Sequence, residues 1–570
     1  MLNYKLYFAG KITSLLTGFE AQDIMAWMEY PANPDQGDLS LPCFRLSKTL
    51  SKSPQVIAEE LKTALEDEHI DEMNAVSGYL NIFLKKSTFA ESLIDHISQA
   101  GERYGSQKLG QGKTVVIDYS SPNIAKPFHV GHLRSTVIGN ALYHIHAFLG
   151  YNCVGINHLG DWGTQFGKLI VAYQLWGSKE AVNERAIDEL LDLYVKFHEE
   201  AEQDPTLEDQ ARSWFTKMEH GDQDALALWQ WFVEISLNEF QKIYKLLGVQ
   251  FDTFQGESFY NDKMEPVIQE LKEKQLVEVD EGALLVRLDA YGMAPALMLK
   301  KDGSSLYHTR DLSAAIYRAD NYAFEKLIYV TDYAQNLHFQ QLFKVVELMG
   351  YTWSSKLEHV AFGRVSIEGG SLSTRKGNVI RLENVLEQSI QKIREVIEAR
   401  NPNLANKAIV AEQVGIGAVI FNDLSANRIK DIDFSWEEAL NFDGETGPYV
   451  QYTYARTCSV LKKAISSDWH AKETYEVDGA NLQNKEAMAV VKMLYLFPER
   501  VEQAMVKLEP SIVSRYLIDL AQAFNRFYHA CYILVEDVHV REARLALVQC
   551  VQITLRNGLK LIGLQAPNEI

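Results

Sequence analysis

The sequence contains no long apolar run of the kind that spans a membrane. A membrane-spanning helix needs about 20 mainly apolar residues, and no stretch of the 570 residues approaches that length. The N-terminus also lacks the basic segment followed by an apolar run that marks a secretory signal. We therefore expect a cytoplasmic protein that does not bind a membrane.

Paired cysteines are missing as well. The five cysteines are odd in number, scattered, and never spaced as Cys-x-x-Cys. They are Cys43, Cys153, Cys458, Cys531 and Cys550. This pattern predicts neither a disulfide framework nor a structural zinc site, so we expect no metal ion bound by the protein's own side chains.

A surplus of basic residues, typical of proteins that bind nucleic acids, is absent. The net charge is −20, whereas phosphate contacts need Lys and Arg. The acidic residues are unevenly distributed, however, because many lie between residues 178 and 250. From residue 451 to residue 570, Lys and Arg nearly balance Asp and Glu. Local basic surfaces can still form there, so the composition does not exclude an RNA partner.

The length and the patterning of the chain indicate several domains. A chain of 570 residues exceeds what a single core fills, and no internal repeat or low-complexity segment interrupts it. Residues 1–112 are predicted to form a small α+β domain. In it, Ser53 caps a helix that begins at Pro54, a strand covers residues 78–84, and residues 101–113 form a linker.

Residues 114–149 predict a strand, a loop and a helix, which together open a doubly wound α/β domain. The strand is the β-branched run 114–119, and the helix covers residues 132–149. Apolar runs at 284–288, 326–330 and 359–365 alternate with helical patterns, as a parallel sheet requires. We assign residues 113–386 to this Rossmann-type domain, with an insertion at about 178–300.

Strand signals almost vanish after residue 387. A polar break at 401–406 precedes a series of helical patterns at 408–426, 449–465, 485–506, 512–535 and 542–562. We assign residues 387–447 to a connecting helical region and residues 448–570 to an all-α bundle. The predicted fold class is multidomain α/β, with a parallel-sheet domain between a small α+β domain and this bundle.

The segment SSPNIAKPFHVGH, which ends at His132, lies between the predicted strand and helix of the α/β domain. His129 and His132 stand at the start of the helix, whose unpaired N–H groups and positive dipole end favour phosphate. Gly131 lets a flat base approach the backbone closely. The alternatives are a surface histidine pair or half of a metal site, although no further ligands follow at a zinc-like spacing.

This segment, together with NHLGDWGTQFG after it, resembles the His-Ile-Gly-His signature region of class I arginyl-tRNA synthetases. The resemblance extends in order through LKKDGSSLYHTRDLSAA, YVTDYAQNLHFQQLF, SLSTRKGNV and GETGPYVQYTYAR, and therefore covers most of the chain. It implies a ligase that activates L-arginine with ATP and Mg²⁺ and then esterifies it to the 3′-terminal adenosine of tRNA(Arg). We expect it to act as a monomer.

The resemblance also implies a second phosphate loop, SLSTRKGN, with two departures. Ser371 stands where the family signature usually has its first Lys, and Leu372 replaces its Met. The second signature Lys is missing too. Lys126, three residues before His129, is thought to compensate in this family. The residues expected at the reacting phosphates are Lys126, His129, His132, Ser373, Arg375 and Lys376. His338 is expected to face the nucleotide. For Arg375 and Lys376, the alternative is that they are solvated charges of the loop.

An arginine pocket must satisfy a planar guanidinium with five donors, for which a carboxylate is the best single partner. By resemblance the pocket residues are Asp118, Asn123, Tyr307, Asp311 and Gln335. Tyr307 and Asp311 are four apart in a helical stretch and so share one face, and we assign these two to the guanidinium. The alternatives are a helix-start residue for Asp311 and a core residue for Tyr307.

The helical C-terminal region resembles the anticodon-binding bundle of this family, and the N-terminal domain resembles its additional tRNA-contacting domain. Splayed bases stack on aromatic rings and guanidinium planes, although an aromatic stripe is more often core. The candidate tRNA contacts are Tyr79, Asn81, Tyr449, Tyr452, Arg456, Tyr528 and Tyr532.

Two other readings remain. One is a class I synthetase for another amino acid such as cysteine, against which the lack of paired cysteines and the presence of Asp311 argue. The other is a synthetase-like RNA-binding protein without catalytic activity, favoured only by the altered Ser371 and Leu372. Pyrophosphate exchange with different amino acids separates these readings.

Overall fold

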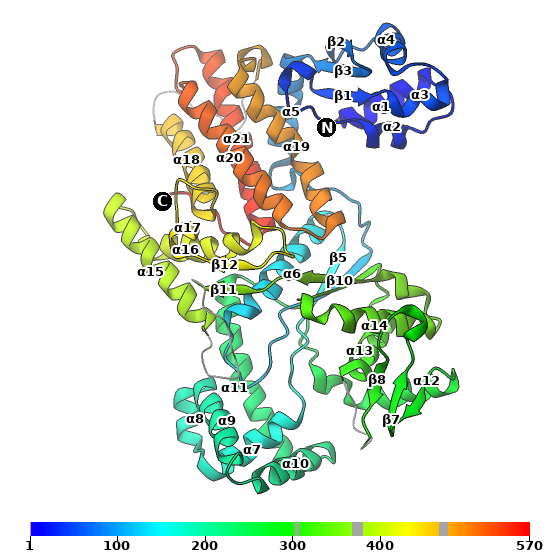
Figure 1. Ribbon diagram of the computed structural model, residues 1–570. Helices are drawn as coiled ribbons and strands as arrows, with labels where there is room; N and C mark the ends of the chain where they lie inside the picture. Colours follow the sequence, from blue (N-terminus) through cyan, green and yellow to red (C-terminus); the bar gives the residue numbers. More distant parts are fainter. Residues whose placement is uncertain (1, 302–306, 368–379, 467–476) are drawn as a thin grey trace. The chain divides into compact units, whose positions relative to one another are not determined.

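The computed structural model describes residues 2–301, 307–367, 380–466 and 477–570 and divides into two compact units (Figure 1). Unit 1 comprises Met1–Tyr104, Arg456–Phe497 and Asp519–Thr554. Unit 2 comprises Gly105–Ala455, Pro498–Ile518 and Leu555–Ile570. Each unit is therefore built from three separate stretches of the chain.

The N-terminal part of unit 1 is a three-stranded antiparallel sheet with helices. Its strands are β1 (Leu39–Pro42), β2 (Ile70–Val76) and β3 (Tyr79–Leu84), in the order β1-β3-β2. Its helices are α1 (Tyr4–Leu15), α2 (Ala21–Trp27), α3 (Phe44–Leu50), α4 (Pro54–Ala64) and α5 (Lys86–Ala100). Ser53 caps α4, because its hydroxyl oxygen accepts a hydrogen bond from the N–H of Val56. The predicted helix start and strand are both confirmed.

The C-terminal helices contribute to both units. They are α18 (Gly447–Ser466), α19 (Lys485–Lys507), α20 (Ser511–Ala530) and α21 (Val538–Leu561). The four predicted helices of this region are confirmed, although α20 ends earlier than expected. Unit 2 is completed by residues after α21: the backbone carbonyl of Gln565 accepts a hydrogen bond from Gln451, and the side chain of Asn568 accepts one from the Tyr454 hydroxyl.

The central element of unit 2 is a four-stranded parallel sheet in the order β10-β9-β4-β5. Its strands are β4 (Thr114–Asp118), β5 (Asn152–Ile156), β9 (Lys326–Asp332) and β10 (Leu357–Phe362), accompanied by α6 (Val130–Phe148), α13 (Tyr307–Tyr322) and α14 (Asn336–Leu348). The predicted strands at 114–119 and 326–330 are confirmed, and so is the doubly wound class. The order of the chain reverses between β4 and β9, so a crevice for ligands is expected at the carboxyl ends of these two strands.

The predicted strand at 284–288 does not belong to the parallel sheet, so that assignment is wrong. It forms β7 (Ala283–Val286) in a separate antiparallel sheet with β6 (Glu278–Asp280) and β8 (Ala296–Leu299). The physical reason is the two-residue turn between β6 and β7, in which Glu281 and Gly282 both have positive φ. Such a turn reverses the chain at once and can only join antiparallel strands. The run 359–365 is likewise divided between β10 and β11 (Val365–Ile367).

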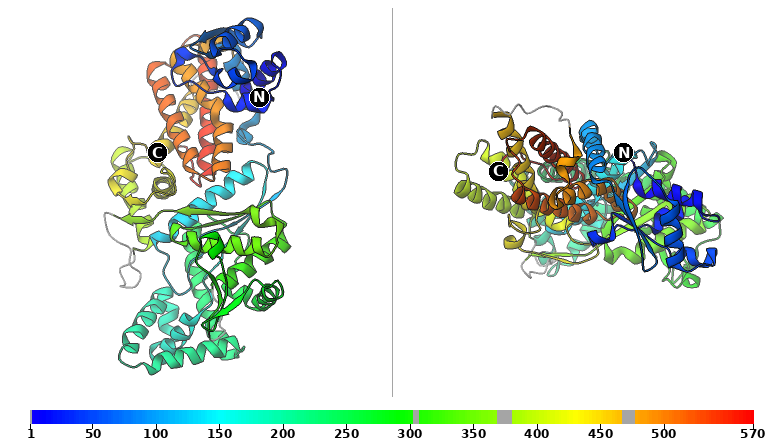
Figure 2. Two further views of the ribbon diagram at one scale, coloured as in Figure 1. Left: turned by 45° about the vertical axis from the view of Figure 1, so that its right-hand side comes forward. Right: turned by 90° about the horizontal axis from the view of Figure 1, so that it is seen from above.

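Helices form most of the remainder of unit 2. Those after β5 are α7 (Thr164–Trp176), α8 (Lys179–Arg185), α9 (Ile187–Ala201), α10 (Thr206–Glu219), α11 (Gln223–Leu247) and α12 (Met264–Glu273), with the 3-10 helix η3 (Glu257–Lys263) before α12. Helices α7 to α10 gather in one cluster, at the bottom of Figure 1 and of the left view of Figure 2.

The connecting region is helical, as predicted. It contains α15 (Leu382–Arg400), α16 (Lys407–Leu424) and α17 (Trp436–Ala439), and its strand β12 (Ile432–Phe434) pairs with β11. The predicted break at 401–406 separates α15 from α16. Among the helices that the structure describes, none is both long and apolar enough to cross a membrane.

Candidate active site

The loop of residues 119–129 joins β4 to α6 at the point where the order of the sheet reverses. Three residues of this loop that are not glycine, Ser120, Ser121 and Ala125, have positive φ, which costs backbone energy. Buried hydroxyl groups hold the strained backbone: the N–H of Ser120 donates to Ser135 Oγ at 2.8 Å, and the N–H of Ala125 donates to Ser236 Oγ at 3.0 Å. The loop is therefore a fixed part of the crevice.

His129 and His132 form a reciprocal cap at the start of α6. The N–H of Gly131 donates to His129 Nδ1 at 3.0 Å, and the N–H of His129 donates to His132 Nδ1 at 3.1 Å. The two rings stack with their centroids 3.7 Å apart. Because each Nδ1 is an acceptor, each neutral ring carries its proton on Nε2. The pair thus presents two N–H donors beside a helix N-terminus, an arrangement suited to phosphate oxygens.

Both histidines are held neutral. Burial, and after it the charge of Lys126, lowers the pKa of His129 to about 4. Burial also lowers the pKa of His132 well below its usual value, and the neighbouring His129 and Lys126 act in the same direction. A Cβ atom at Gly131 would lie 2.8 Å from His129 Cε1, so only glycine leaves room for this ring arrangement.

We expect a His129→Asn variant to weaken the pH dependence of stability. The pKa of His129 falls on folding, so below its usual value of 6.5 the unfolded chain binds more protons than the folded chain. Stability is then lost as the pH falls from about 6.5 toward 4. Asparagine can replace the Nδ1 acceptor of His129 with its amide oxygen and does not titrate. The decrease of the urea midpoint between pH 7 and pH 5 should therefore be smaller for the variant than for the wild type. Equal decreases of the urea midpoint in the two proteins would contradict this assignment. A comparison of the two midpoints at pH 8 measures the stability lost through the altered cap alone.

Lys126 lies half-buried in the same loop. Its ammonium group is 5.9 Å from the centroid of the Tyr194 ring on α9, and burial lowers its pKa. It is close enough to His129 and His132 to shift the pKa of both. The structure therefore brings together Lys126, His129 and His132 as the sequence analysis expected.

The second phosphate loop, with Ser373, Arg375 and Lys376, lies outside the described residues. The residues that follow it are described and pair with the first loop. The N–H of Val130 donates to the carbonyl of Ile380 at 3.2 Å, and the N–H of Leu382 donates to the carbonyl of Phe128 at 3.0 Å. Arg381, between them, forms an ion pair of 2.5 Å with Asp188. The chain thus leaves the second loop directly beside His129.

Arg134, on α6, fastens this region to the connecting helices. Its side chain is 1% exposed, and its Nε lies 3.3 Å from Asp423 Oδ1. Its Nη1 donates to the carbonyls of Gly363 at 2.9 Å and Lys430 at 2.7 Å. Burial raises the pKa of Asp423, and Arg134 opposes that rise. The pair joins α6 to α16 and to the turn between β10 and β11.

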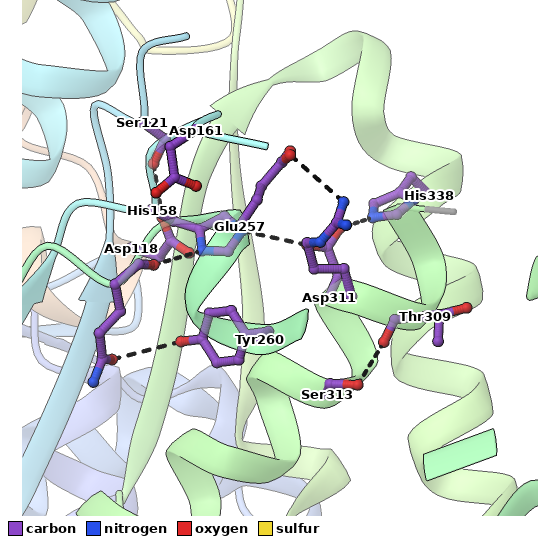
Figure 3. Close-up of polar contacts among 12 residues, drawn as sticks. Asp118, Ser121, His158, Asp161, Glu257, Tyr260, Thr309, Asp311, Ser313 and His338 are labelled. Atoms are coloured by element: carbon purple, nitrogen blue, oxygen red, sulfur yellow. Dashed lines mark hydrogen bonds and ion pairs between the residues drawn. The ribbon is translucent and has the colours of Figure 1, made fainter. Parts of the chain in front are cut away.

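Asp311 lies on α13 between two histidines (Figure 3). Its Oδ2 is 2.6 Å from His338 Nε2, and its Oδ1 is 3.8 Å from His158 Nε2. Burial acts to raise the pKa of Asp311, but the hydrogen bond with His338 and the nearby charges lower it. Asp311 is therefore an ionised carboxylate. His338, which we expect to face the nucleotide, contacts this acid through its Nε2.

A second acid near Asp311 was not recognised in the sequence. Glu257, on η3, lies 3.5 Å from Arg310 Nη1. Burial raises the pKa of Glu257 to about 7, and the charges of Asp311 and Asp161 act in the same direction. Asp161 accepts hydrogen bonds from the N–H and the hydroxyl of Ser258 at 2.8 and 2.7 Å. The segments that carry these acids are far apart in sequence, so no local spacing revealed them.

Asp118, the last residue of β4, is already paired. Its Oδ2 lies 2.8 Å from Arg318 Nη2, and the Ser121 hydroxyl donates to its Oδ1 at 3.0 Å. Arg318 is fully buried and lies over the Tyr329 ring, 5.5 Å from its centroid. Asp118 and Asp311 both act on the pKa of Tyr329, so the two carboxylates share one region. The charge of Asp118, however, is largely balanced by Arg318.

The other predicted pocket residues are exposed. Tyr307, the first residue of α13, is 67% exposed. Gln335 ends a 3-10 helix before α14, and its side chain is exposed. Asn123 is exposed, and its backbone forms a bridge with Gly160. The structure therefore buries Asp118, partly buries Asp311, and leaves these three side chains nearer the solvent.

The predicted tRNA contacts are distributed over several elements. On α18, Tyr449 is half-buried and Tyr452 is exposed. The Arg456 guanidinium donates to Asn525 and lies 5.2 Å from the Tyr528 ring centroid. Tyr532 is 87% exposed.

The two N-terminal candidates differ in exposure. Tyr79 is exposed at the end of the β2–β3 hairpin, where its ring lies edge-on to Phe44. Asn81 is 7% exposed and accepts a hydrogen bond from the Ser40 hydroxyl at 2.7 Å. Among the residues that the structure describes, no three or more His, Cys, Asp or Glu side chains are arranged to hold a metal ion.

Three parts of the chain match known protein families. Residues 94–436 match the family described as tRNA synthetases class I (R), catalytic domain. Residues 450–570 match the DALR anticodon binding domain, and residues 3–84 match the arginyl tRNA synthetase N terminal domain.

Whole proteins also match over their full length. The arginine–tRNA ligase of Alkaliphilus metalliredigens is 54% identical over 99% of this chain and 100% of its own length, and that of Clostridioides difficile is 51% identical over 100% of both. The arginyl-tRNA synthetase structure from Thermus thermophilus has a TM-score of 0.81 at 27% identity, covering 95% of this chain and 96% of its own. The one from Plasmodium falciparum has a TM-score of 0.81 at 25% identity, covering 100% and 98%.

Proposed function

The chain belongs to the class I arginyl-tRNA synthetases, and from this premise we propose how its own residues carry out the reaction of an arginine–tRNA ligase. In the first step the arginine carboxylate attacks the α-phosphorus of ATP, which forms arginyl-adenylate and releases pyrophosphate. In the second step a hydroxyl of the 3′-terminal adenosine of tRNA(Arg) attacks the activated carbonyl carbon, and AMP leaves.

ATP binds against the start of α6, with His129 and His132 as donors to its phosphates. The support is the reciprocal cap, because it fixes both Nε2–H groups in neutral rings beside the helix N-terminus. ATP enters as its Mg²⁺ complex, since the ion offsets phosphate charge. Gly131 lies beside the base, as the sequence analysis proposed.

Lys126 supplies positive charge to the transition state of activation. Negative charge develops on the α-phosphate and on the leaving pyrophosphate, and fixed cations stabilise it. Ser373, Arg375 and Lys376 are proposed to act from the second loop, whose sequence lacks both signature lysines. The support for Lys126 is its place in the nucleotide loop, where it influences both histidines.

We expect a Lys126→Met variant to lower the turnover of arginine activation by at least about 10²-fold, similar to the loss of one donor to a developing oxyanion. Methionine keeps the length of the side chain and removes its charge. Lys126→Arg is the matched control and should retain more activity. ATP–pyrophosphate exchange in the presence of tRNA measures both. A methionine variant with wild-type turnover would show that other residues supply the charge.

The guanidinium of arginine binds between Asp311 and Glu257. The single observation that supports this pocket best is the ionised carboxylate of Asp311, which is close enough to a second acid, Glu257, to raise the pKa of that acid. A guanidinium that lies between two carboxylates can pair more of its five N–H donors than a guanidinium with a single carboxylate partner. Tyr307 closes the pocket from α13, and Asp118, Asn123 and Gln335 hold the α-amino and carboxylate ends or form the wall.

Charging assays with arginine and lysine test this function. Lysine carries one compact ammonium group, which cannot bond to both carboxylates in the way a planar guanidinium can. Carboxylate oxygens would therefore be left unpaired. Aminoacylation of tRNA(Arg) should therefore depend on ATP, Mg²⁺ and arginine. Equal charging with lysine would contradict the pocket.

The tRNA contacts at Tyr79, Asn81, Tyr449, Tyr452, Arg456, Tyr528 and Tyr532 are proposed on the same basis. The match of residues 450–570 to an anticodon-binding domain supports the last four, and Tyr449 directly precedes the matched range. The domain limits 1–112, 113–386, 387–447 and 448–570, the monomeric state and the cytoplasmic location stay predictions.

A further inference from the structure

Ser236 is a fully buried residue in the middle of α11, the helix that leads out of the α7–α10 cluster (Figure 1). Its Oγ accepts a hydrogen bond of 3.0 Å from the N–H of Ala125 in the nucleotide loop. The Ser236 hydroxyl donates its own proton to the carbonyl of Phe232 at 2.8 Å. The proton of this side chain is therefore used within α11, and its oxygen accepts from the loop.

An apolar side chain at residue 236 could not make both contacts. Alanine is a better helix former than serine, but it would leave the buried N–H of Ala125 without its partner, which is costly. Phe232 and Phe240, on either side of Ser236 along α11, are fully buried. The Phe240 ring lies 5.8 Å from the ring of Phe128 in the loop. The surroundings of the Ser236 hydroxyl are therefore largely apolar, and its bond to the loop is a specific one.

This hydrogen bond fixes Ala125 in a backbone conformation that alanine does not favour. The φ of Ala125 is +59°, a left-handed value that costs energy for a residue with a Cβ atom. The residue before it is fixed too, because the N–H of Ile124 donates to the carbonyl of Gly160 at 3.1 Å. Without the Ser236 hydroxyl, the backbone at Ala125 can relax toward an ordinary negative φ.

Lys126 follows Ala125 directly, so its direction depends on this backbone. Pro127 comes next and restricts Lys126 to extended conformations. Among the residues that the structure describes, no carboxylate forms an ion pair with the Lys126 ammonium group, whose contact is the Tyr194 ring at 5.9 Å. The direction of the Lys126 side chain is therefore determined by Ala125 on one side and Pro127 on the other.

We propose that Ser236 is a positioning residue for arginine activation: it fixes Ala125 and thereby directs the ammonium group of Lys126 toward the phosphates of ATP. The inference rests on the proposed role of Lys126 and adds the group that places it. Ser236 is fully buried, so it acts through Lys126 and not on a substrate. His129 and His132 do not depend on it, because they form their own reciprocal cap.

A double-mutant cycle with Lys126→Met tests this role. ATP–pyrophosphate exchange in the presence of tRNA, with the full chain, gives the turnover and the KM values for ATP and arginine. Ser236→Ala should lower the turnover by about 10- to 10²-fold, as a small misplacement of a reacting group does. Both KM values should stay within about threefold of wild type, because Lys126 acts on charge that develops in the transition state.

The losses of turnover in the two single variants should not multiply. In the Lys126→Met background no ammonium group is left for Ser236 to place, so the double variant should be as slow as Lys126→Met alone. A general weakening of the fold would instead multiply the two losses.

Ser313→Ala is the matched control. Ser313 is a buried serine of α13 whose hydroxyl, like that of Ser236, donates to a carbonyl four residues earlier, in this case that of Thr309 (Figure 3). The same chemical change at Ser313 should leave the turnover unchanged, because this residue does not contact the nucleotide loop.

The outcomes separate this inference from the proposed function. Wild-type turnover in Lys126→Met overturns the role of Lys126, and the inference with it. If Lys126→Met is slow, three results overturn the inference alone: wild-type turnover in Ser236→Ala, a loss that multiplies in the double variant, or an equal loss in Ser313→Ala. If Ser236→Ala does not fold, Ser236→Cys takes its place in the cycle, because cysteine has nearly the shape of serine but its sulfur is a weak acceptor. Wild-type turnover in Ser236→Cys would overturn the inference as well.

Discussion

Replacing Asp311 with asparagine is expected to lower kcat/KM for arginine by about 10²- to 10³-fold. The substitution leaves the guanidinium facing a neutral amide in a largely desolvated pocket, and breaking such a pair typically costs about 3–5 kcal/mol. About 1.4 kcal/mol corresponds to one decade. The KM for ATP should change little, because the nucleotide loop lies on a different segment. Steady-state aminoacylation measures both constants.

Asp320→Asn is the matched control for this experiment. Asp320 lies on the same helix, α13, and its side chain is exposed, so the same chemical change there should leave arginine kinetics unaltered. Circular dichroism verifies that both variants fold. A folded Asp311→Asn enzyme within about threefold of wild type would mean that Asp311 has a structural role, and Glu257 would become the main carrier of specificity.

Replacing Arg134 with methionine should destabilise unit 2 by about 3–5 kcal/mol, because it leaves Asp423 buried without its ion-pair partner. The same change also removes the donors to the carbonyls of Gly363 and Lys430. Thermal unfolding should show the transition of unit 2 shifted to lower temperature by several degrees. Activation should weaken as well, since the turn after β10 leads toward the second phosphate loop.

The double variant Arg134→Met with Asp423→Leu separates charge from packing. Replacing both partners by apolar side chains of similar size removes the unpaired acid and should recover part of the lost stability. The carbonyl donors stay lost in both variants. If the single and double variants unfold at the same temperature, the ion pair contributes little, and the hydrogen bonds of Arg134 account for the whole effect.

The helices were predictable because a long stretch of apolar residues at helical spacing is seldom mistaken for a strand. The helices of residues 447–570 and the β4–loop–α6 segment all follow from apolar periodicity and from signals such as His-x-Gly-His. β5 (Asn152–Ile156) was missed because its five residues, which follow a helix, are too few to show a regular spacing of apolar residues. The strand at 284–288 was recognised, but its sheet was not. Its sheet is determined by the two-residue turn before it, and the pattern of apolar residues does not reveal the positive φ values of that turn.

The site was predictable only where its chemistry is local in sequence. Lys126, His129 and His132 stand within seven residues, so one motif contains them. Glu257 and His158 come from segments separated by about 100 residues and meet Asp311 only in the folded chain. A glutamate in a loop is most often solvated, and nothing in its neighbours distinguishes one that is buried. The pairing of Asp118 with Arg318 was invisible for the same reason.

The division of each unit into three chain segments affects how the protein matures during synthesis. Residues 555–570 complete unit 2, where Gln451 and Tyr454 bond to them, yet the ribosome makes them after residues 1–554. The emerging polypeptide can form the β4–α6 region early but cannot close the whole unit until residue 570 has left the exit tunnel. Unit 1 likewise waits for residue 554. Such late closure by distant segments slows folding and exposes apolar surfaces for longer, so the nascent protein should depend on chaperones that hold partly folded chains.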